Sequence, residues 1–127
     1  MSRSIAAVGL LLAATLAGAC QADYAGLEVM VDGPIRDGTT VDREPFVVPV
    51  GHVARIFVRP RSSSAELFED PDALRLRSRD PEILQIYGDE EDWRWNLVGH
   101  AFGSTCVEVV IGGRVEECIE TQVTASP

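Results

Sequence analysis

The chain has 127 residues with 20 acidic residues, 11 arginines and no lysine, which gives a formal net charge of −9 at pH 7. A surface this acidic repels nucleic acid and anionic lipid headgroups, so the composition argues against binding to either. The chain has two histidines and three cysteines and lacks a G-x-S-x-G motif. Few of its residues could therefore act as catalytic nucleophiles or metal ligands. We therefore expect no enzyme activity, no metal and no cofactor.

The first nineteen residues have the pattern of an export signal. Arg3 precedes an unbroken run of small and apolar residues at 5–16, which is too short for a comfortable membrane span. Ala17 and Ala19 form an A-x-A site for ordinary signal peptidase. Alternatively, Ala-Gly-Ala-Cys resembles a bacterial lipobox, in which the Cys20 thiol is acylated and becomes the mature N-terminus, although Ala17 stands where that motif prefers leucine. We expect the second route, and both routes export the chain.

Removal of the signal leaves about 108 residues, which suffice for one domain with a hydrophobic core but not for two. We expect residues 1–19 to be a signal peptide, residues 20–26 the lipid-anchor cysteine and a tether, and residues 27–127 the folded domain. The protein would then be anchored to the membrane of the bacterial cell envelope through the lipid on Cys20. The two remaining cysteines, Cys106 and Cys118, would pair in an oxidising compartment.

Short segments with strand patterning follow one another along the domain. They are 27–31, 46–50, 53–59, 74–79, 83–87, 93–98 and a hairpin at 97–123 with Gly112 and Gly113 at its tip. Pro49 favours a sheet edge for its segment because proline lacks the amide donor. Residues 65–69 allow one helical turn at most. The pattern predicts an all-β fold, an antiparallel β-sandwich of about seven strands.

Three short motifs resemble the bacterial immunoglobulin-like domain family, group 2. Val48–Gly51 matches its V-x-V-G turn, Ser78–Leu84 its S-x-D-P-x-x-L segment, and Gly99–Val109 its G-x-x-x-G-x-x-x-V-x-V signature. Leu76 stands where the family often has tryptophan. The resemblance covers residues 46–123 and implies an immunoglobulin-like sandwich that serves as a structural or adhesive module, without catalytic residues.

The family pattern also orients the final hairpin. It directs alternate residues of both strands toward the core: Thr105, Val107, Val109, Ile119, Thr121 and Val123. Cys106 and Cys118 then share the outer face, where a cross-strand disulfide requires a register such as Val110 opposite Arg114 around a three-residue loop. A two-residue Gly-Gly turn would put the cysteines on opposite faces. We expect the disulfide and therefore the longer loop.

The strongest charge run is Asp89, Glu90, Glu91 and Asp92, followed by Trp93. The fold would place this loop at the same end as a second acidic connection, which contains Glu66, Glu69, Asp70 and Asp72. Carboxylates that converge there would suit calcium, but the run lacks the spacing that arranges ligands around one ion, so a solvated loop is favoured. Trp95 alternates with Leu97 as a core residue does, whereas Trp93 would be exposed to a glycan or peptide.

Two further features concern metals and partners. His52 and His100 both follow Val-Gly at turns that the fold brings to one end, and we interpret them as turn residues rather than metal ligands. Four glutamates would repel one another on the outer face of the hairpin unless a basic partner screens them. They are Glu108, Glu116, Glu117 and Glu120.

The sequence therefore predicts a non-catalytic envelope lipoprotein that acts as a structural or protein-interaction module. The alternative is a small carbohydrate- or calcium-dependent ligand-binding module that uses the acidic loop and Trp93. Besides the membrane, the partner would be another envelope protein or a glycan.

Overall fold

The computed structural model describes residues 23–64, 68–89 and 91–125. Within these ranges the chain forms eight strands and a short 3-10 turn: β1 (Tyr24–Val31), β2 (Phe46–Pro49), β3 (Val53–Ser62), η1 (Pro71–Ala73), β4 (Leu74–Ser78), β5 (Leu84–Gly88), β6 (Arg94–Gly99), β7 (Gly103–Ile111) and β8 (Arg114–Thr124). The predicted signal peptide, Cys20, Glu66 and Glu90 lie outside the described residues, as does most of the predicted helical turn at 65–69. In the described part of the chain, no helix has the length and apolar character needed to cross a membrane.

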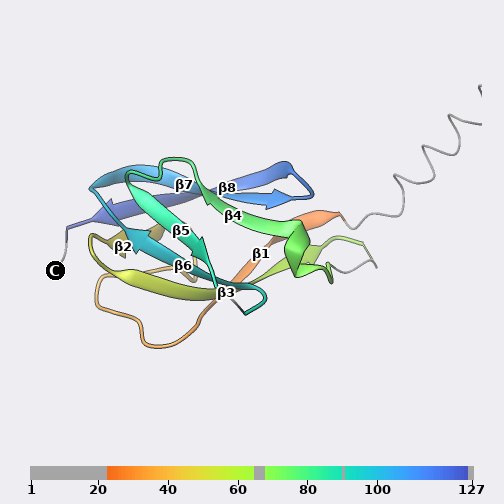
Figure 1. Cartoon of the computed structure of the whole chain (residues 1–127), viewed down its shortest axis with the longest axis horizontal. Coiled ribbons are helices and arrows are strands. Elements are labelled where there is room, and N and C mark those ends of the chain that lie inside the picture. The colour runs from red at the N-terminus through yellow and green to blue at the C-terminus, as the bar shows by residue number, and fades with distance from the viewer. Residues whose placement is uncertain (1–22, 65–67, 90, 126–127) are drawn as a thin grey trace, which may run out of the picture.

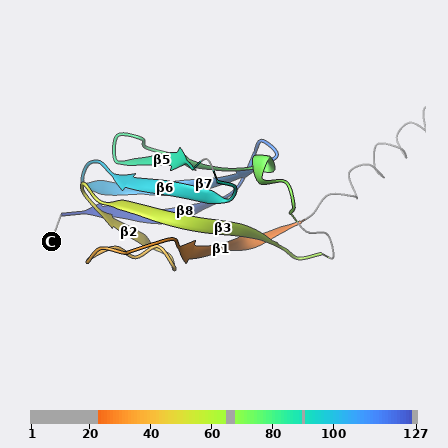
Figure 2. The same ribbon diagram turned by 60° about the horizontal axis from the view of Figure 1, so that its bottom comes forward.

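The strands form two four-stranded sheets that pack face to face (Figure 1). One sheet has the order β1-β3-β6-β5, which Figure 2 shows from the bottom to the top of the view, and the other has the order β2-β8-β7-β4. These orders match strands A-B-E-D and G-F-C of the immunoglobulin fold, with β2 added beside the last strand. The predicted immunoglobulin-like sandwich is confirmed, with eight strands in place of about seven.

The core lies between the two sheets and follows from the alternation of each strand. In β4, Leu74, Leu76 and Ser78 are buried, whereas the arginines between them are exposed. Ile56 of β3 and Leu97 of β6 are fully buried in the opposite sheet. Burial of such apolar side chains supplies most of the free energy that favours folding. The strict alternation of apolar residues and arginine in β4 therefore predicted its two faces correctly.

The N-terminal part of the chain contributes to both sheets. β1 begins at Tyr24, before the predicted start of the domain at Leu27, because a β-bulge between Tyr24 and Gly26 lets the chain stay paired with β3. β2 then crosses to the other sheet and runs parallel to β8 at the sheet edge. The edge position that the missing amide donor of Pro49 predicted is confirmed.

The final hairpin ends in a two-residue turn rather than the predicted three-residue loop. Ile111 faces Arg114 across Gly112 and Gly113. Both glycines have positive φ angles, 58° and 83°, which the tightest hairpin turns require and which glycine adopts without strain. The prediction of the longer loop was wrong because the Gly-Gly pair closes the hairpin by itself.

The predicted disulfide between Cys106 and Cys118 is nevertheless present, with the two Cα atoms 5.3 Å apart. A β-bulge between Val109 and Val110 inserts one extra residue into β8 and shifts the register beyond it. Cys106 therefore lies opposite Glu120, and Cys118 is its diagonal neighbour on the same face. The bulge compensates for the short turn, which alone would have separated the cysteines.

Candidate functional site

A cleft of about 490 Å³ opens at the end of the sandwich where η1 and the acidic loop meet β5 and β6. Trp93 and Trp95 line it together with four carboxylates: Asp72, Asp89, Glu91 and Asp92. Asp72 belongs to the acidic connection before β4, so the predicted meeting of the two acidic segments occurs at this end. The cleft combines aromatic and charged surface and is more polar than the usual small-molecule pocket, which is mostly apolar.

Much of the negative charge in the cleft is neutralised within the protein. Asp89 pairs with Arg55 at 3.1 Å. Arg94 pairs with Glu91 and donates a hydrogen bond to Asp32 at 2.8 Å, and that bond raises the pKa of the Arg94 guanidinium. Across the described ranges, no group of three or more His, Cys, Asp or Glu side chains is placed to hold a metal ion. The cleft is a mixed-charge surface rather than a cage of free carboxylates.

Trp93 is held in an unusual backbone conformation. Its φ angle is 67°, in the left-handed region that bulky residues rarely adopt. The Val58 amide donates a hydrogen bond to the Trp93 carbonyl oxygen at 2.8 Å, and the Arg59 guanidinium lies 4.7 Å from the centre of the indole ring. These contacts with β3 fix the ring at the mouth of the cleft, where a cation–π interaction with Arg59 stabilises it.

Trp93 is not as exposed as predicted. Trp93 and Trp95 are both half-buried and pack against the edge of the core. Trp95 lies against the backbone of Gly88 in β5, so it remains accessible at the open side of the sandwich. Sequence alternation correctly placed Trp95 on the inner face but could not show that the inner face is open at this point.

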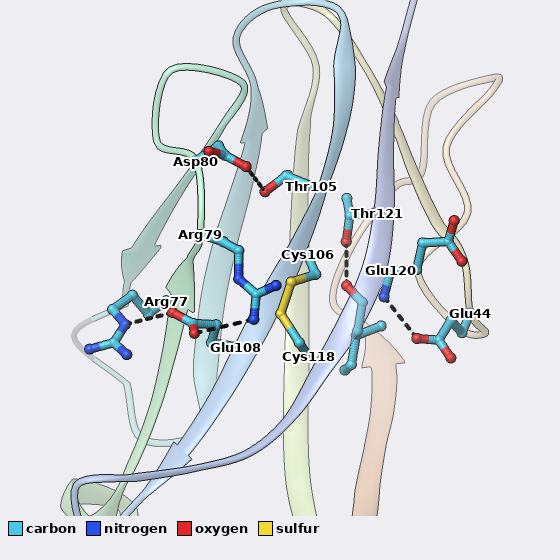
Figure 3. Close-up of a disulfide and its surroundings, with 11 residues drawn as sticks. Glu44, Arg77, Arg79, Asp80, Thr105, Cys106, Glu108, Cys118, Glu120 and Thr121 are labelled. Atoms are coloured by element: carbon cyan, nitrogen blue, oxygen red, sulfur yellow. Dashed lines mark hydrogen bonds and ion pairs between the residues drawn. A yellow bond between two sulfur atoms is a disulfide. The ribbon is translucent and has the colours of Figure 1, made fainter.

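The outer face of the β2-β8-β7-β4 sheet carries arginines beside the disulfide (Figure 3). Arg77 donates a hydrogen bond to Glu108 at 2.9 Å, and Arg79 lies 3.7 Å from the same carboxylate. On the other side of the disulfide, the Glu120 amide donates to the Glu44 carboxylate at 2.8 Å. Glu108 is therefore compensated by arginines from the neighbouring strand instead of facing other acids.

Glu117 does not belong to this outer face. It lies opposite the fully buried Val109 and accepts a hydrogen bond from the Tyr24 hydroxyl of β1, which belongs to the other sheet. Burial, followed by this hydrogen bond, raises the pKa of Tyr24 above its ordinary value. The predicted face of four repelling glutamates was therefore wrong, because Glu108 is paired with arginines and Glu117 alternates with Ile119 and Thr121 on the inner face.

The two Val-Gly-His turns meet at the opposite end of the sandwich, as the sequence predicted. The Gly51 amide donates to the Gly99 carbonyl at 2.8 Å, and the Gly99 amide donates to the His52 carbonyl at 3.1 Å. A Cβ atom at Gly99 would overlap the carbonyl oxygen of Pro49. The repeated motif thus serves a close contact between two backbone segments, and His52 and His100 flank that contact.

No family model matches the chain, and no curated protein sequence matches it either. Among solved structures, the fold is similar to the crystal structure of the S-layer protein SbsC domains 4 and 5, with a TM-score of 0.53 and 17% sequence identity over 83% of this chain. The chain covers 54% of the length of that structure. The likeness shows the β-sandwich fold, whereas membership of the group 2 immunoglobulin-like family stays a prediction.

Proposed function

We propose that the protein is a non-catalytic, lipid-anchored envelope module that acts as a structural or protein-interaction domain. The observation that carries the proposal is a disulfide-bonded immunoglobulin-like sandwich behind an export-type N-terminus. Disulfides persist in the oxidising compartments that exported proteins reach. A protein that shares the sandwich fold is by name an S-layer protein, which supports a place in the envelope.

The position of β1 supports attachment close to the membrane. β1 begins at Tyr24, so few residues would separate the folded domain from a lipid on Cys20. The hydrogen bond between Tyr24 and Glu117 joins the start of the folded domain to β8. The net charge of −9 is repelled by anionic headgroups, which would keep the sandwich off the membrane surface and available to a partner.

Fractionation of cells that express the full chain tests the proposal. We expect the protein in the membrane fraction, with an acylated Cys20 at its N-terminus by mass spectrometry. Cys20→Ala should move the protein to the soluble exported fraction. The double variant Cys106→Ala/Cys118→Ala is the matched control, since it removes the other two thiols and should leave the lipid in place. An unacylated Cys20 in a soluble wild-type protein would contradict the anchor.

The cleft favours a second candidate function, a small carbohydrate- or calcium-dependent ligand-binding module. Trp93 and Trp95 stand beside several carboxylates there, and glycans stack on aromatic rings while their hydroxyls bond to acids. Titration with calcium or with oligosaccharides should then change the intrinsic tryptophan fluorescence. Trp93→Phe should reduce the change, whereas an unchanged signal in the wild-type protein argues for the structural role.

A further inference from the structure

A groove runs along the side of the sandwich where β4 and β5 are the last strands of their sheets. Two adjoining hollows of about 320 and 280 Å³ lie between these strands. Leu76, Ile86 and Tyr87 line both hollows, and Trp95 lines the larger one. Tyr87 is 53% exposed. The groove therefore presents apolar surface directly beside two sheet edges.

The backbone of β4 has one edge that faces away from its sheet. β4 pairs with β7 in the sheet and lies at the end of the strand order. The Ala73 carbonyl and the Arg79 amide bond toward the β7 side, to Gly112 and Cys106. The alternation of an antiparallel ladder then directs the amide and carbonyl groups of Leu76 to the opposite edge. In variable-type immunoglobulin domains, this same edge accepts additional strands.

Ser78 is a lining residue of the groove whose hydroxyl is buried beneath it. It is 9% exposed and lines the smaller hollow. Among the residues that the structure describes, its Oγ atom has no hydrogen-bond partner. A buried hydroxyl without a partner costs free energy, and such groups in folded proteins call for an explanation. The Oγ atom is enclosed, so a segment in the groove would bond instead to the main-chain groups of Ser78 at the open edge of β4.

Arginines on β4 determine which charge a segment bound beside this strand should carry. Arg75 and Arg77 of β4 and Arg79 just after it occupy alternate positions on the outer face, and Glu108 pairs with the last two (Figure 3). Three cations against one carboxylate leave an excess of positive charge on a chain whose net charge is −9. In a strand laid beside β4, alternate residues would be direct cross-strand neighbours of these arginines.

We propose that the groove binds an extended segment of a partner protein that adds a strand to β4. The segment alternates acidic residues, which lie beside the arginines, with apolar residues, which fill the hollows. Main-chain hydrogen bonds provide the affinity, and the alternation provides the specificity. This inference rests on the proposed role as an interaction module and gives that role a site and a partner chemistry.

A labelled peptide of alternating glutamate and valine is the probe, and fluorescence anisotropy measures its binding to the full chain. A peptide of the same composition, with all glutamates before all valines, controls for charge alone. We expect saturable binding of the alternating peptide and weaker binding of the block peptide. Amide hydrogen exchange of Leu76 and Ser78 should slow in the complex, because a strand pairs with that edge.

A charge-reversing substitution on β4 tests whether the peptide binds at this strand or is attracted to positive charge in general. Arg75→Glu should weaken binding of the alternating peptide about tenfold, because an attractive cross-strand pair becomes repulsive. Arg114→Glu makes the same charge change at the hairpin tip, away from the groove, and should leave binding unaltered.

Three results would overturn the proposal: no binding of the alternating peptide at millimolar concentration, equal binding of the two peptides, or equal effects of the two variants. Unchanged exchange of the Leu76 and Ser78 amides in the complex would also overturn it. Acylation of Cys20 is measured separately by fractionation, so the docking site can fail while the envelope function holds.

Discussion

The two ends of the sandwich are closed by different parts of the chain. At the end with the Val-Gly-His turns, backbone groups of Gly51, His52 and Gly99 bond directly to one another. At the other end β6 pairs with the first half of β3 only, although β3 continues to Ser62. This second end also has backbone bonds, from Val58 to Trp93 and from Gly112 to Ala73, but side chains line the cleft there. η1 and the hairpin tip lie at this end, at the right of Figure 1.

This difference predicts which end contributes more to the stability of the fold and which end is better suited to binding. Backbone contacts leave no room for variation, because any side chain at Gly99 meets the main chain of Pro49. Side-chain closure leaves polar pairs and aromatic rings beside the cleft, and each of these can change without displacing the backbone. We therefore expect substitutions at the first end to cost much stability, and substitutions at the second end to cost less and to alter surface chemistry.

The largest effect is expected at the backbone-closed end. Gly99→Ala should lower the free energy of unfolding by about 3 kcal/mol, because the methyl group forces two backbone segments apart. Gly51→Ala is the matched control at the same contact. Its Cβ meets open space, and only its φ of 81° penalises the substitution, by about 1 kcal/mol. Urea unfolding measures both, and a greater loss for Gly51→Ala would contradict the steric account.

At the second end, the bond between Tyr24 and Glu117 joins the two sheets. Tyr24→Phe should lower the free energy of unfolding by about 1–2 kcal/mol, because a half-buried carboxylate loses its donor. Tyr87→Phe is the control, since among the described residues the exposed Tyr87 hydroxyl bonds to Gln85 within its own strand and not across the sheets. Similar losses in the two variants would show that the bond does not hold the sheets together.

Tyr24 also makes the stability of the protein sensitive to alkaline pH. Because the fold raises the pKa of Tyr24, the unfolded chain releases this proton first as the pH rises. The stabilisation is complete below the ordinary tyrosine pKa of about 10 and declines above it. Stability curves against pH should therefore fall less steeply above pH ~10 in Tyr24→Phe than in the wild-type protein. Parallel curves would contradict the raised pKa.

The sequence was sufficient to predict the structure wherever a single strand or a single turn determines it. The alternation of β4, the edge position of Pro49 and the contact between the Val-Gly-His turns each depend on local pattern and on the topology of the fold family. The disulfide also followed from export chemistry, because two cysteines in one hairpin have few alternatives.

The sequence was insufficient wherever one extra residue changes a register. The bulge between Val109 and Val110 leaves no distinctive residue pattern, yet it brings Cys118 to the same face as Cys106 across a two-residue turn. The pair of Tyr24 and Glu117 joins residues 93 positions apart, and the positive φ of Trp93 arises from its contacts with β3. The β4–β5 groove likewise depends on how two sheets end beside one another, which no single segment encodes.

The strain at Trp93 provides a smaller effect at the side-chain-closed end. Trp93→Ala and Trp93→Gly both remove the ring and its contact with Arg59, but only glycine adopts a φ of 67° without cost. Trp93→Gly should therefore be more stable than Trp93→Ala by about 1 kcal/mol. This order reverses the usual preference for alanine. Denaturant midpoints measured for both variants check it, and a more stable Trp93→Ala would show that the loop relaxes out of this conformation.

The smallest effect is expected for the ion pair that borders the cleft. The Arg55 side chain is 57% exposed in its pair with Asp89, so water and salt screen the attraction. Arg55→Ala should change the free energy of unfolding by about 0.5 kcal/mol or less, with a coupling to Asp89→Ala in a double-mutant cycle that shrinks as salt is added. A coupling of about 2 kcal/mol that persists in salt is the size expected for a buried, rigid contact. That outcome would contradict the contrast between the two ends. The side chains at the cleft would then stabilise their end as strongly as the backbone contacts of the Val-Gly-His turns stabilise theirs.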